Sequence, residues 1–105
     1  MGQHAPATRE LDTAAIVRAR VVVDAREQAL AEKGELLLPI AEGAIDASHV
    51  AADLGEVVAG RRPGRRSDDE VTVFCSGGTA LEYMGLAALI VERARAAGCG
   101  RLLDD

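Results

Sequence analysis

The stretch Arg20-Val21-Val22-Val23-Asp24-Ala25-Arg26-Glu27 decides the fold class of this 105-residue chain. Three consecutive valines predict a short strand that is buried on both faces, as strands of parallel sheets are. Asp24 then predicts the N-cap of a helix that begins at once. Glu27 completes a capping box, and Gly34 marks the end of that helix. A strand that passes into a helix with almost no loop is typical of an α/β fold.

Helical patterns lie on both sides of this stretch. A short helix is predicted from Asp12 to Ala19, with Asp12 as its N-cap. Another is predicted to start near Asp46 and to end at Gly60, because apolar residues recur there at helical spacing. The residues of that stripe are Val50, Leu54, Val57 and Val58. Between the two, Leu36-Leu37-Leu38-Pro39-Ile40 is too short and too interrupted by proline for a long element.

The C-terminal part predicts one further strand and one long helix. Glu70-Val71-Thr72-Val73-Phe74 alternates in polarity and predicts the strand. Thr79 and Glu82 predict a capping box for a helix that runs to about Ala97 and is closed by Gly98. Two strands separated by residues 25–69 do not make a stable sheet alone. We therefore expect the sheet to need strands from elsewhere.

Composition places the chain among ordinary soluble domains, with 49% hydrophobic and 28% charged residues. Phe74 and Tyr83 are its only aromatic residues, so the core must be aliphatic. The net charge of −5 gives no basic field for nucleic acid, and we expect none as a partner. The Arg-rich stretch at residues 61–66 precedes three acidic residues and predicts a solvated turn.

Targeting signals and cysteine usage favour a cytoplasmic location. No apolar run approaches the roughly 20 residues that span a bilayer, so no membrane association is expected. The first residues lack the pattern of a secretory signal. Cys75 and Cys99 resemble neither a disulfide framework nor a zinc site, and no metal is expected.

The junction Ser76-Gly77-Gly78 is the strongest local candidate for a binding site. It lies between a predicted strand and a predicted helix, where free N–H groups and the helix dipole favour an anion. The alternative is a tight turn without a ligand. The residues alone favour that turn, because the junction matches neither GxGxxG nor GxxxxGK[ST].

Cys75, His4 and His49 are weaker candidates. Cys75 precedes the glycines, where a helix N-terminus would lower the pKa of a nucleophilic thiol. Position 81 is Leu, however, where a cysteine phosphatase loop would carry Arg, and a buried structural cysteine is the interpretation we favour. His4 is a lone histidine near the terminus, and His49 is expected to be a solvent-facing helix residue.

Four ordered blocks resemble the C-terminal portion of the ornithine cyclodeaminase/μ-crystallin family. Residues 2–12 are similar to the pattern G-x-[D/S/H]-x-P-x-x-R-E-L-D, and residues 20–30 to V-x-V-D-S-x-E-Q-A-L. Residues 54–60 are similar to L-G-E-[VL]-[VI]-x-G. Residues 67–82 resemble S-D-x-x-[IV]-T-V-F-K-S-[VL]-G-x-A-[LV]-x-D. With compatible spacing, the blocks cover nearly the whole chain.

The resemblance implies a fold and a set of partners. Residues 1–60 would be the C-terminal part of a Rossmann-type NAD(P)-binding domain. Residues 61–105 would return to the dimerisation and substrate domain with a strand and a long helix. Members of the family are homodimeric enzymes that use NAD or NADP and act on amino acids or cyclic imines, as ornithine cyclodeaminases, alanine dehydrogenases and ketimine reductases do. The strands that the sheet lacks would then belong to the rest of such an enzyme.

The resemblance also implies site residues. His4 falls where cyclodeaminases have a catalytic Asp and μ-crystallin has Ser, so it is the catalytic candidate and a cofactor-binding one. Ser76, Gly77 and Gly78 match the loop at the nicotinamide end of the cofactor. Three positions depart from the pattern, with Cys75 for Lys, Gly77 for Val or Leu, and Tyr83 for Asp.

The parts of the family site that the chain lacks limit what it is expected to do alone. It has no Gly-rich pyrophosphate turn, and it lacks the Lys and Arg residues that hold the substrate in the N-terminal part of the family. We therefore expect a fragment or truncated member that is inactive alone. Two alternatives are a non-catalytic dimerisation module that pairs with a full-length relative, and a small enzyme that uses Cys75.

Overall fold

Three parallel strands form the centre of the molecule in the computed structural model, which describes residues 5–103. They are β1 (Arg20–Val23), β2 (Val50–Asp53) and β3 (Thr72–Cys75), in the spatial order β2-β1-β3. Val23 lies beside Asp53 on one side and beside Cys75 on the other. The carboxyl ends of the strands therefore meet at one edge of the sheet, and the expected α/β class is confirmed.

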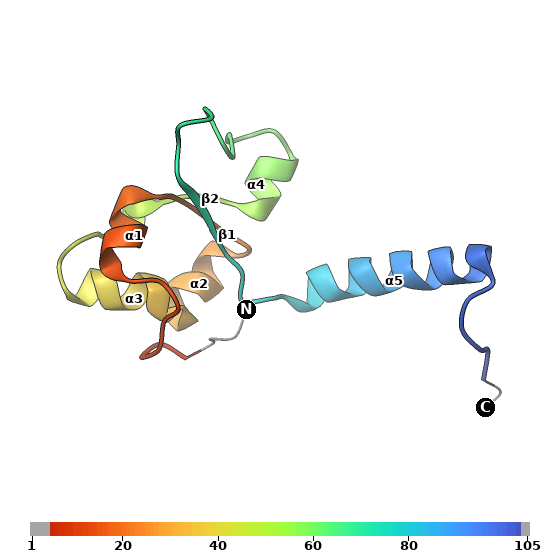
Figure 1. The fold of residues 1–105 in the computed structure, drawn as a ribbon. Coiled ribbons are helices and arrows are strands. Elements are labelled where there is room, and N and C mark those ends of the chain that lie inside the picture. Colours follow the sequence, from red (N-terminus) through yellow and green to blue (C-terminus); the bar gives the residue numbers. More distant parts are fainter. Residues whose placement is uncertain (1–4, 104–105) are drawn as a thin grey trace.

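Of the helices within residues 5–103, the first three cover one side of this sheet and the last extends away from it (Figure 1). They are α1 (Thr13–Arg18), α2 (Arg26–Glu32), α3 (Gly34–Ala41), α4 (Leu54–Val58) and α5 (Ala80–Ala97), with a short 3-10 turn, η1 (Ala47–His49), before β2. The aliphatic core between α1–α3 and the sheet consists of Ile16, Ala19, Val21, Val23, Ala29, Leu36, Val50 and Cys75. This agrees with the composition, since no aromatic side chain belongs to that core.

The first helix and strand follow the sequence closely. Asp12 caps α1 as predicted, because its Oδ1 accepts a hydrogen bond of 2.9 Å from the backbone N–H of Ala15. In β1, Val21 and Val23 are fully buried, whereas Val22 on the opposite face is only partly buried. The expectation of burial on both faces is therefore right for one face only.

The predicted helix from residue 46 to residue 60 is wrong, because a strand occupies its middle. Asp46 caps only the single turn of η1, where its Oδ1 accepts from the Ser48 backbone N–H at 2.9 Å. The chain then forms β2, and Asp53 starts α4 through a capping box with Glu56. Pairing with β1 stabilises the strand, and a helical periodicity along one segment cannot report that distant contact.

The segment around Pro39, for which no long element was expected, forms the eight-residue helix α3. Leu36 and Pro39 are fully buried, so burial of apolar surface offsets the helix hydrogen bond that proline removes. The helix α2 ends at Glu32 with Lys33 as its C-cap, so Gly34 occupies the predicted C′ position, and it also begins α3. A Cβ there would lie 1.8 Å from the carbonyl oxygen of Thr8, so the N-terminal segment can cross only over a glycine.

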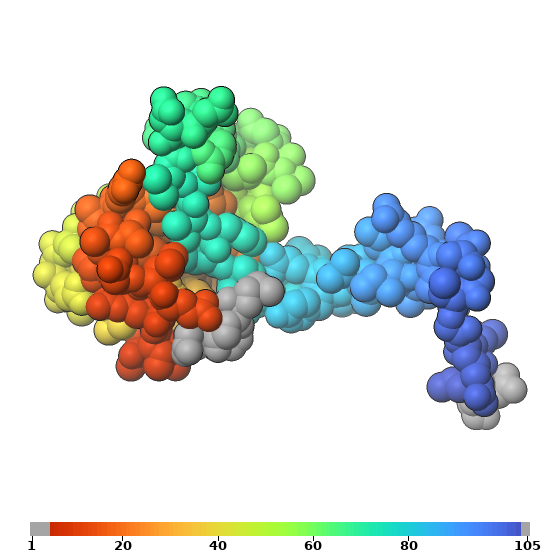
Figure 2. Space-filling model, viewed as in Figure 1, coloured from red at the N-terminus to blue at the C-terminus, as the bar shows by residue number. Residues whose placement is uncertain are grey.

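The long helix α5 projects away from the other elements (Figure 2). The whole molecule, α5 included, measures 55 × 31 × 21 Å. Thr79 and Glu82 form the predicted capping box, and Gly98 ends the helix in the left-handed conformation. No residue of α5 is buried. Its exposed apolar side chains are Leu81, Tyr83, Met84, Leu86, Leu89, Ile90 and Val91. These positions surround the helix, and a helix that is apolar all round is normally buried in a larger assembly.

Two further observations bear on the expected organisation. β3 lies in the same sheet as β1, so a division after residue 60 would separate neighbouring strands, and only α5 leaves the sheet. The division into residues 1–60 and 61–105 therefore stays a prediction.

No helix within residues 5–103 is both long enough and apolar enough to cross a membrane.

Candidate functional site

The loop Ser76-Gly77-Gly78 lies at the carboxyl edge of the sheet and is bound by Asp24. Because Val23 and Cys75 are neighbours in parallel strands, the residues that follow them also meet. The Oδ2 atom of Asp24 accepts hydrogen bonds from the Ser76 hydroxyl at 3.2 Å and from the backbone N–H groups of Gly77 at 2.8 Å and Gly78 at 2.6 Å. One carboxylate oxygen thus holds the whole loop.

This contact corrects the predicted capping box of Asp24 and Glu27. The N-cap of α2 is Ala25, and no side chain caps that helix. Asp24 directs its Oδ1 to the adjacent Ala25 N–H at 3.0 Å and its Oδ2 to the loop. The Asp24 carboxylate lies beside both the start of α2 and the loop that follows the neighbouring strand. Its Oδ2 accepts hydrogen bonds from the loop.

The anion-binding chemistry expected of the loop is present, but the anion is a side chain of the same protein. Gly77 and Gly78 donate to Asp24, and the next N–H, that of Thr79, donates to Glu82 at 2.8 Å. Hydrogen bonds to an ionised acceptor are stronger than neutral ones. A phosphate at these N–H groups would have to displace a bound carboxylate.

Two side chains from the α2 segment also hold the loop. Gln28 donates from Nε2 to the carbonyl oxygen of Gly78 at 3.3 Å, and Lys33 donates from Nζ to that of Ser76 at 3.4 Å. Asp24, Gln28 and Lys33 are called the loop clamp below. Asp24 and Gln28 occupy the D and Q positions of the pattern that residues 20–30 resemble. The sequence analysis did not predict the clamp. The spacing of Asp24 and Gln28, four residues apart at the start of one helix, was the signal that could have indicated it.

The two glycines of the loop have different roles. Gly78 has a φ of 74°, and a Cβ there would lie 1.8 Å from the hydroxyl oxygen of Tyr83. At Gly77 the nearest atoms to a Cβ would be Gln28 Nε2 at 3.7 Å and Lys33 Cδ at 3.9 Å, which are ordinary contacts. The backbone therefore requires glycine at position 78 and leaves room for a side chain at position 77.

A buried ion pair lies next to the loop. Lys33 and Glu35 have side chains that are only 5% exposed, with 3.7 Å between Nζ and Oε2. Glu35 Oε1 accepts from the backbone N–H of Glu10 at 2.9 Å. Removing two charges from water is costly unless further polar contacts compensate. The residues around this pair must therefore supply those contacts. The pair connects the N-terminal segment, α3 and the loop.

The structure contradicts the alternative that Cys75 is a nucleophile. The residue is buried, and loss of hydration followed by the charge of Glu35 raises the pKa of its thiol to about 11. A reactive cysteine needs the opposite, an accessible thiol with a lowered pKa. Cys75 is therefore a core residue. Within residues 5–103, no three His, Cys, Asp or Glu side chains are placed to hold a metal ion.

His4, the catalytic candidate, lies outside the described residues. The residues that follow it form a turn in which the Thr8 N–H donates to the carbonyl oxygen of Ala5 at 3.2 Å. This turn passes over Gly34, the residue next to Lys33 of the loop clamp. The described N-terminal segment and the loop thus approach the same junction between α2 and α3.

Comparisons with known proteins agree with the resemblance seen in the sequence. The sequence profile of the ornithine cyclodeaminase/μ-crystallin family matches residues 1–98. A Δ1-pyrroline-2-carboxylate reductase of Bacillus cereus is 41% identical over 105 residues, which are 99% of this chain and 32% of that protein.

Two solved structures share the fold. The Thermococcus litoralis Δ1-pyrroline-2-carboxylate reductase in complex with NADH and L-proline has a TM-score of 0.80 and 39% identity, over 93% of this chain and 30% of its own. An archaeal alanine dehydrogenase dimer with bound NAD has a TM-score of 0.75 and 35% identity, over 96% of this chain and 31% of its own. The chain therefore spans about a third of the length of these relatives. It belongs to the ornithine cyclodeaminase/μ-crystallin family.

Proposed function

We propose that this chain is the nicotinamide-side part of an NAD(P)-dependent enzyme that reduces the C=N bond of a cyclic imine or imino acid, and that it is inactive alone. The observation that carries the proposal is the clamped loop Ser76-Gly77-Gly78 at the carboxyl edge of a parallel sheet, where ligands of such sheets bind. Relatives with the same fold bind NADH or NAD.

The charges near the loop suit the nicotinamide end of a dinucleotide better than its pyrophosphate. A cleft of about 770 Å³ lies between α2, α4 and the start of α5. Its apolar lining includes Leu30, Leu54, Val58 and Leu81, and its charged lining is Asp24, Glu27, Asp53, Glu82 and Arg26. Carboxylates repel phosphates, whereas apolar walls accommodate an aromatic ring. The residues present therefore suit a nicotinamide, and the pyrophosphate would be held by another part of the enzyme.

When bound, NAD(P)H supplies a hydride to the carbon of the C=N bond, and the nitrogen takes up a proton. The chain's own contribution is to position the loop through Asp24, Gln28 and Lys33. His4 is proposed to exchange the proton, since the resemblance places it at the catalytic position and the unperturbed pKa of imidazole lies near 6.5.

The rest of the enzyme is proposed to cover α5. The helix carries apolar side chains on every side, among them Leu81 at 83% and Met84 at 72% exposure. Such a helix is stable in water only when other polypeptide surrounds it. We propose a homodimer or an association with the missing portion as that cover, with residues 61–105 contributing to it.

Fragment complementation tests this function. The 105-residue chain is purified alone and also co-expressed with the N-terminal two thirds of the Bacillus cereus relative, and oxidation of NADH or NADPH is followed with Δ1-pyrroline-2-carboxylate. No turnover is expected for the chain alone, and turnover is expected for the combination. His4→Ala should lower kcat at least tenfold, and Asp69→Ala, at an exposed position, serves as the control. Turnover by the chain alone would refute the fragment proposal, and an inactive but assembled pair would refute the catalytic one.

A dimerisation module without catalysis is the second candidate, and the exposed apolar surface of α5 favours it. Light scattering of the chain mixed with a full-length relative distinguishes the two. A mixed oligomer that forms without raising turnover supports the module. The absence of any mass shift removes it.

A further inference from the structure

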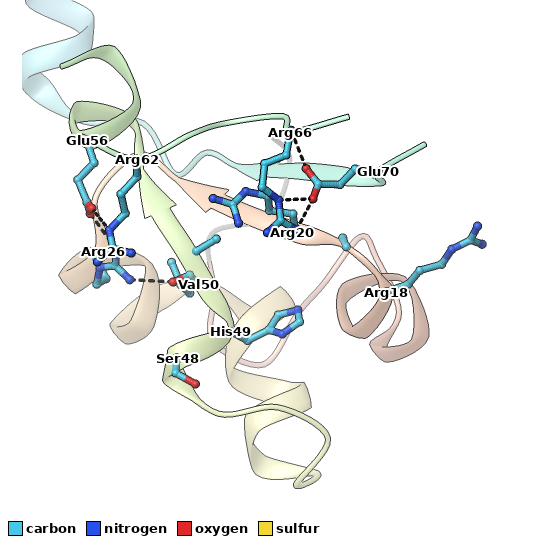
Figure 3. Close-up of a pocket in the computed structure, with 12 residues that line it drawn as sticks. Arg18, Arg20, Arg26, Ser48, His49, Val50, Glu56, Arg62, Arg66 and Glu70 are labelled. Carbon is cyan, nitrogen blue, oxygen red and sulfur yellow. Dashed lines mark hydrogen bonds and ion pairs between the residues drawn. The ribbon is translucent and has the colours of Figure 1, made fainter. Parts of the chain in front are cut away.

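A second cleft of about 840 Å³ lies toward the amino ends of the strands, away from the clamped loop. Figure 3 shows arginine side chains on two of its walls, with His49 and Val50 between them. The ionisable residues of the lining are Arg18, Arg20, Arg26, Arg62, Arg66, His49, Glu56 and Glu70. The Arg18 side chain points away from the cleft, so four arginines and two glutamates set its charge.

One wall is formed by two arginines that share one carboxylate. Glu56 accepts from Arg26 Nη2 at 2.8 Å and pairs with Arg62 Nε at 2.6 Å. The hydrogen bond from Arg26 is the main cause that lowers the pKa of Glu56 to about 2, so this carboxylate is ionised at neutral pH. Arg26 is also fixed by a 2.8 Å hydrogen bond to the carbonyl oxygen of Val50. The group of three charges therefore carries a net charge of +1.

The other wall repeats this arrangement. Arg66 donates from Nε to Glu70 Oε2 at 2.7 Å. Arg20 is fixed by two backbone carbonyl oxygens, those of Gly64 and Pro63, each at 2.8 Å. These two carbonyl oxygens hold the Arg20 guanidinium in place, and its positive charge also helps to lower the pKa of Glu70, after the hydrogen bonds from Arg66. This wall also carries a net charge of +1.

Two surplus positive charges facing one cleft are unexpected in a chain whose net charge is −5. Arginines fixed by carbonyl oxygens and shared carboxylates also keep further N–H donors, and these match phosphate and carboxylate oxygens in geometry. The arrangement is therefore that of a preorganised receptor for an anion.

We propose that the cleft between Arg20 and Arg62 binds a small ligand with two negative charges, carried on phosphate or carboxylate oxygens. One charge would face each wall. This cleft is distinct from the proposed cofactor cleft, although Arg26 of α2 lines both. Its other lining residues come from the segments around the starts of β1 and β2, from α4 and from the segment before β3. It would serve the enzyme as an effector site.

The test titrates the 105-residue chain, labelled with ¹⁵N, with inorganic pyrophosphate and separately with succinate at low ionic strength. Saturable binding of either probe is expected, with amide shifts at Ser48–Ala51. Arg62→Gln should weaken the binding about tenfold, because one charge-assisted hydrogen bond is lost. Arg93→Gln on α5 is the matched control and should leave the affinity unchanged. Circular dichroism of each variant checks the fold, and Arg20→Gln is a second variant.

Three results would overturn the proposal. The first is no saturation with either probe. The second is an equal loss of affinity in the Arg93 control, which would indicate general charge attraction. The third is a shift confined to residues 76–78, which would place the anion at the proposed cofactor site. Because the readout needs no turnover, failure here is distinguishable from failure of the proposed function.

Discussion

Asp24 Oδ2 lies 2.6 Å from the backbone nitrogen of Gly78, a residue 54 positions further along the chain. The contact joins the end of β1 to the start of the α5 segment, and it occupies N–H groups that would otherwise be free to bind an anion. The position of the loop is therefore set by a side chain of the neighbouring strand, and its loss should be measurable in stability.

Asp24→Asn should destabilise the chain by about 2 kcal/mol, because the hydrogen bonds from Gly77 and Gly78 lose their charged acceptor. Urea unfolding followed by circular dichroism measures the change. Asp12→Asn is the control, since asparagine is an N-cap as good as aspartate and this substitution should be nearly neutral. Equal stability of the two variants would contradict the clamp.

The two loop glycines should respond differently to alanine. Gly78→Ala places a Cβ on a residue with a φ of 74° and against Tyr83, and should cost about 2 kcal/mol of stability. Gly77→Ala meets only ordinary contacts and should change stability by less than about 0.5 kcal/mol. The same urea experiment measures both, and a larger loss at Gly77 would refute the assigned roles.

The elements that the sequence predicts correctly carry local signals. The capping residues Asp12 and Thr79 mark the starts of α1 and α5, and the valines of residues 21–23 mark β1. β2 was missed because its four residues are a strand only by pairing with β1. The proline-containing α3 was missed because buried contacts with the rest of the fold stabilise it.

The candidate site was predictable only where local sequence signals mark its residues. The glycines at positions 77 and 78 indicate a special turn, and the resemblance adds Ser76. The partner of these residues depends on strand order, which no local pattern contains. Asp24 followed by Glu27 satisfies the capping-box pattern, yet its carboxylate binds the loop that the neighbouring strand β3 brings beside it.

Cys75 should resist alkylation in the folded chain, whereas Cys99 should react readily. At pH 8 a thiol with a pKa of about 11 is roughly one thousandth ionised, and Cys75 is also buried. Treatment with iodoacetamide followed by mass spectrometry should show one modified site before unfolding and two afterwards. With Cys99→Ser, the folded chain should show none. Rapid labelling of Cys75 without denaturant would restore the nucleophile alternative.

Glu56 should make the stability of the chain depend on acid pH. Arg26 lowers the pKa of Glu56 from 4.5 to about 2 in the folded state, so the folded carboxylate binds a proton less readily than the unfolded one. Its contribution is complete above pH 4.5 and is lost as the pH falls toward 2. The free energy of unfolding should therefore decrease over this range, and the decrease should be smaller in Glu56→Gln. Glu70, whose pKa is also lowered by Arg66, contributes in the same direction and remains in the variant. Glu92→Gln on α5 is the control, and its profile should match that of the unchanged chain. An unaltered slope in Glu56→Gln would show that the shared carboxylate of the arginine cleft is not a stabilising ion pair.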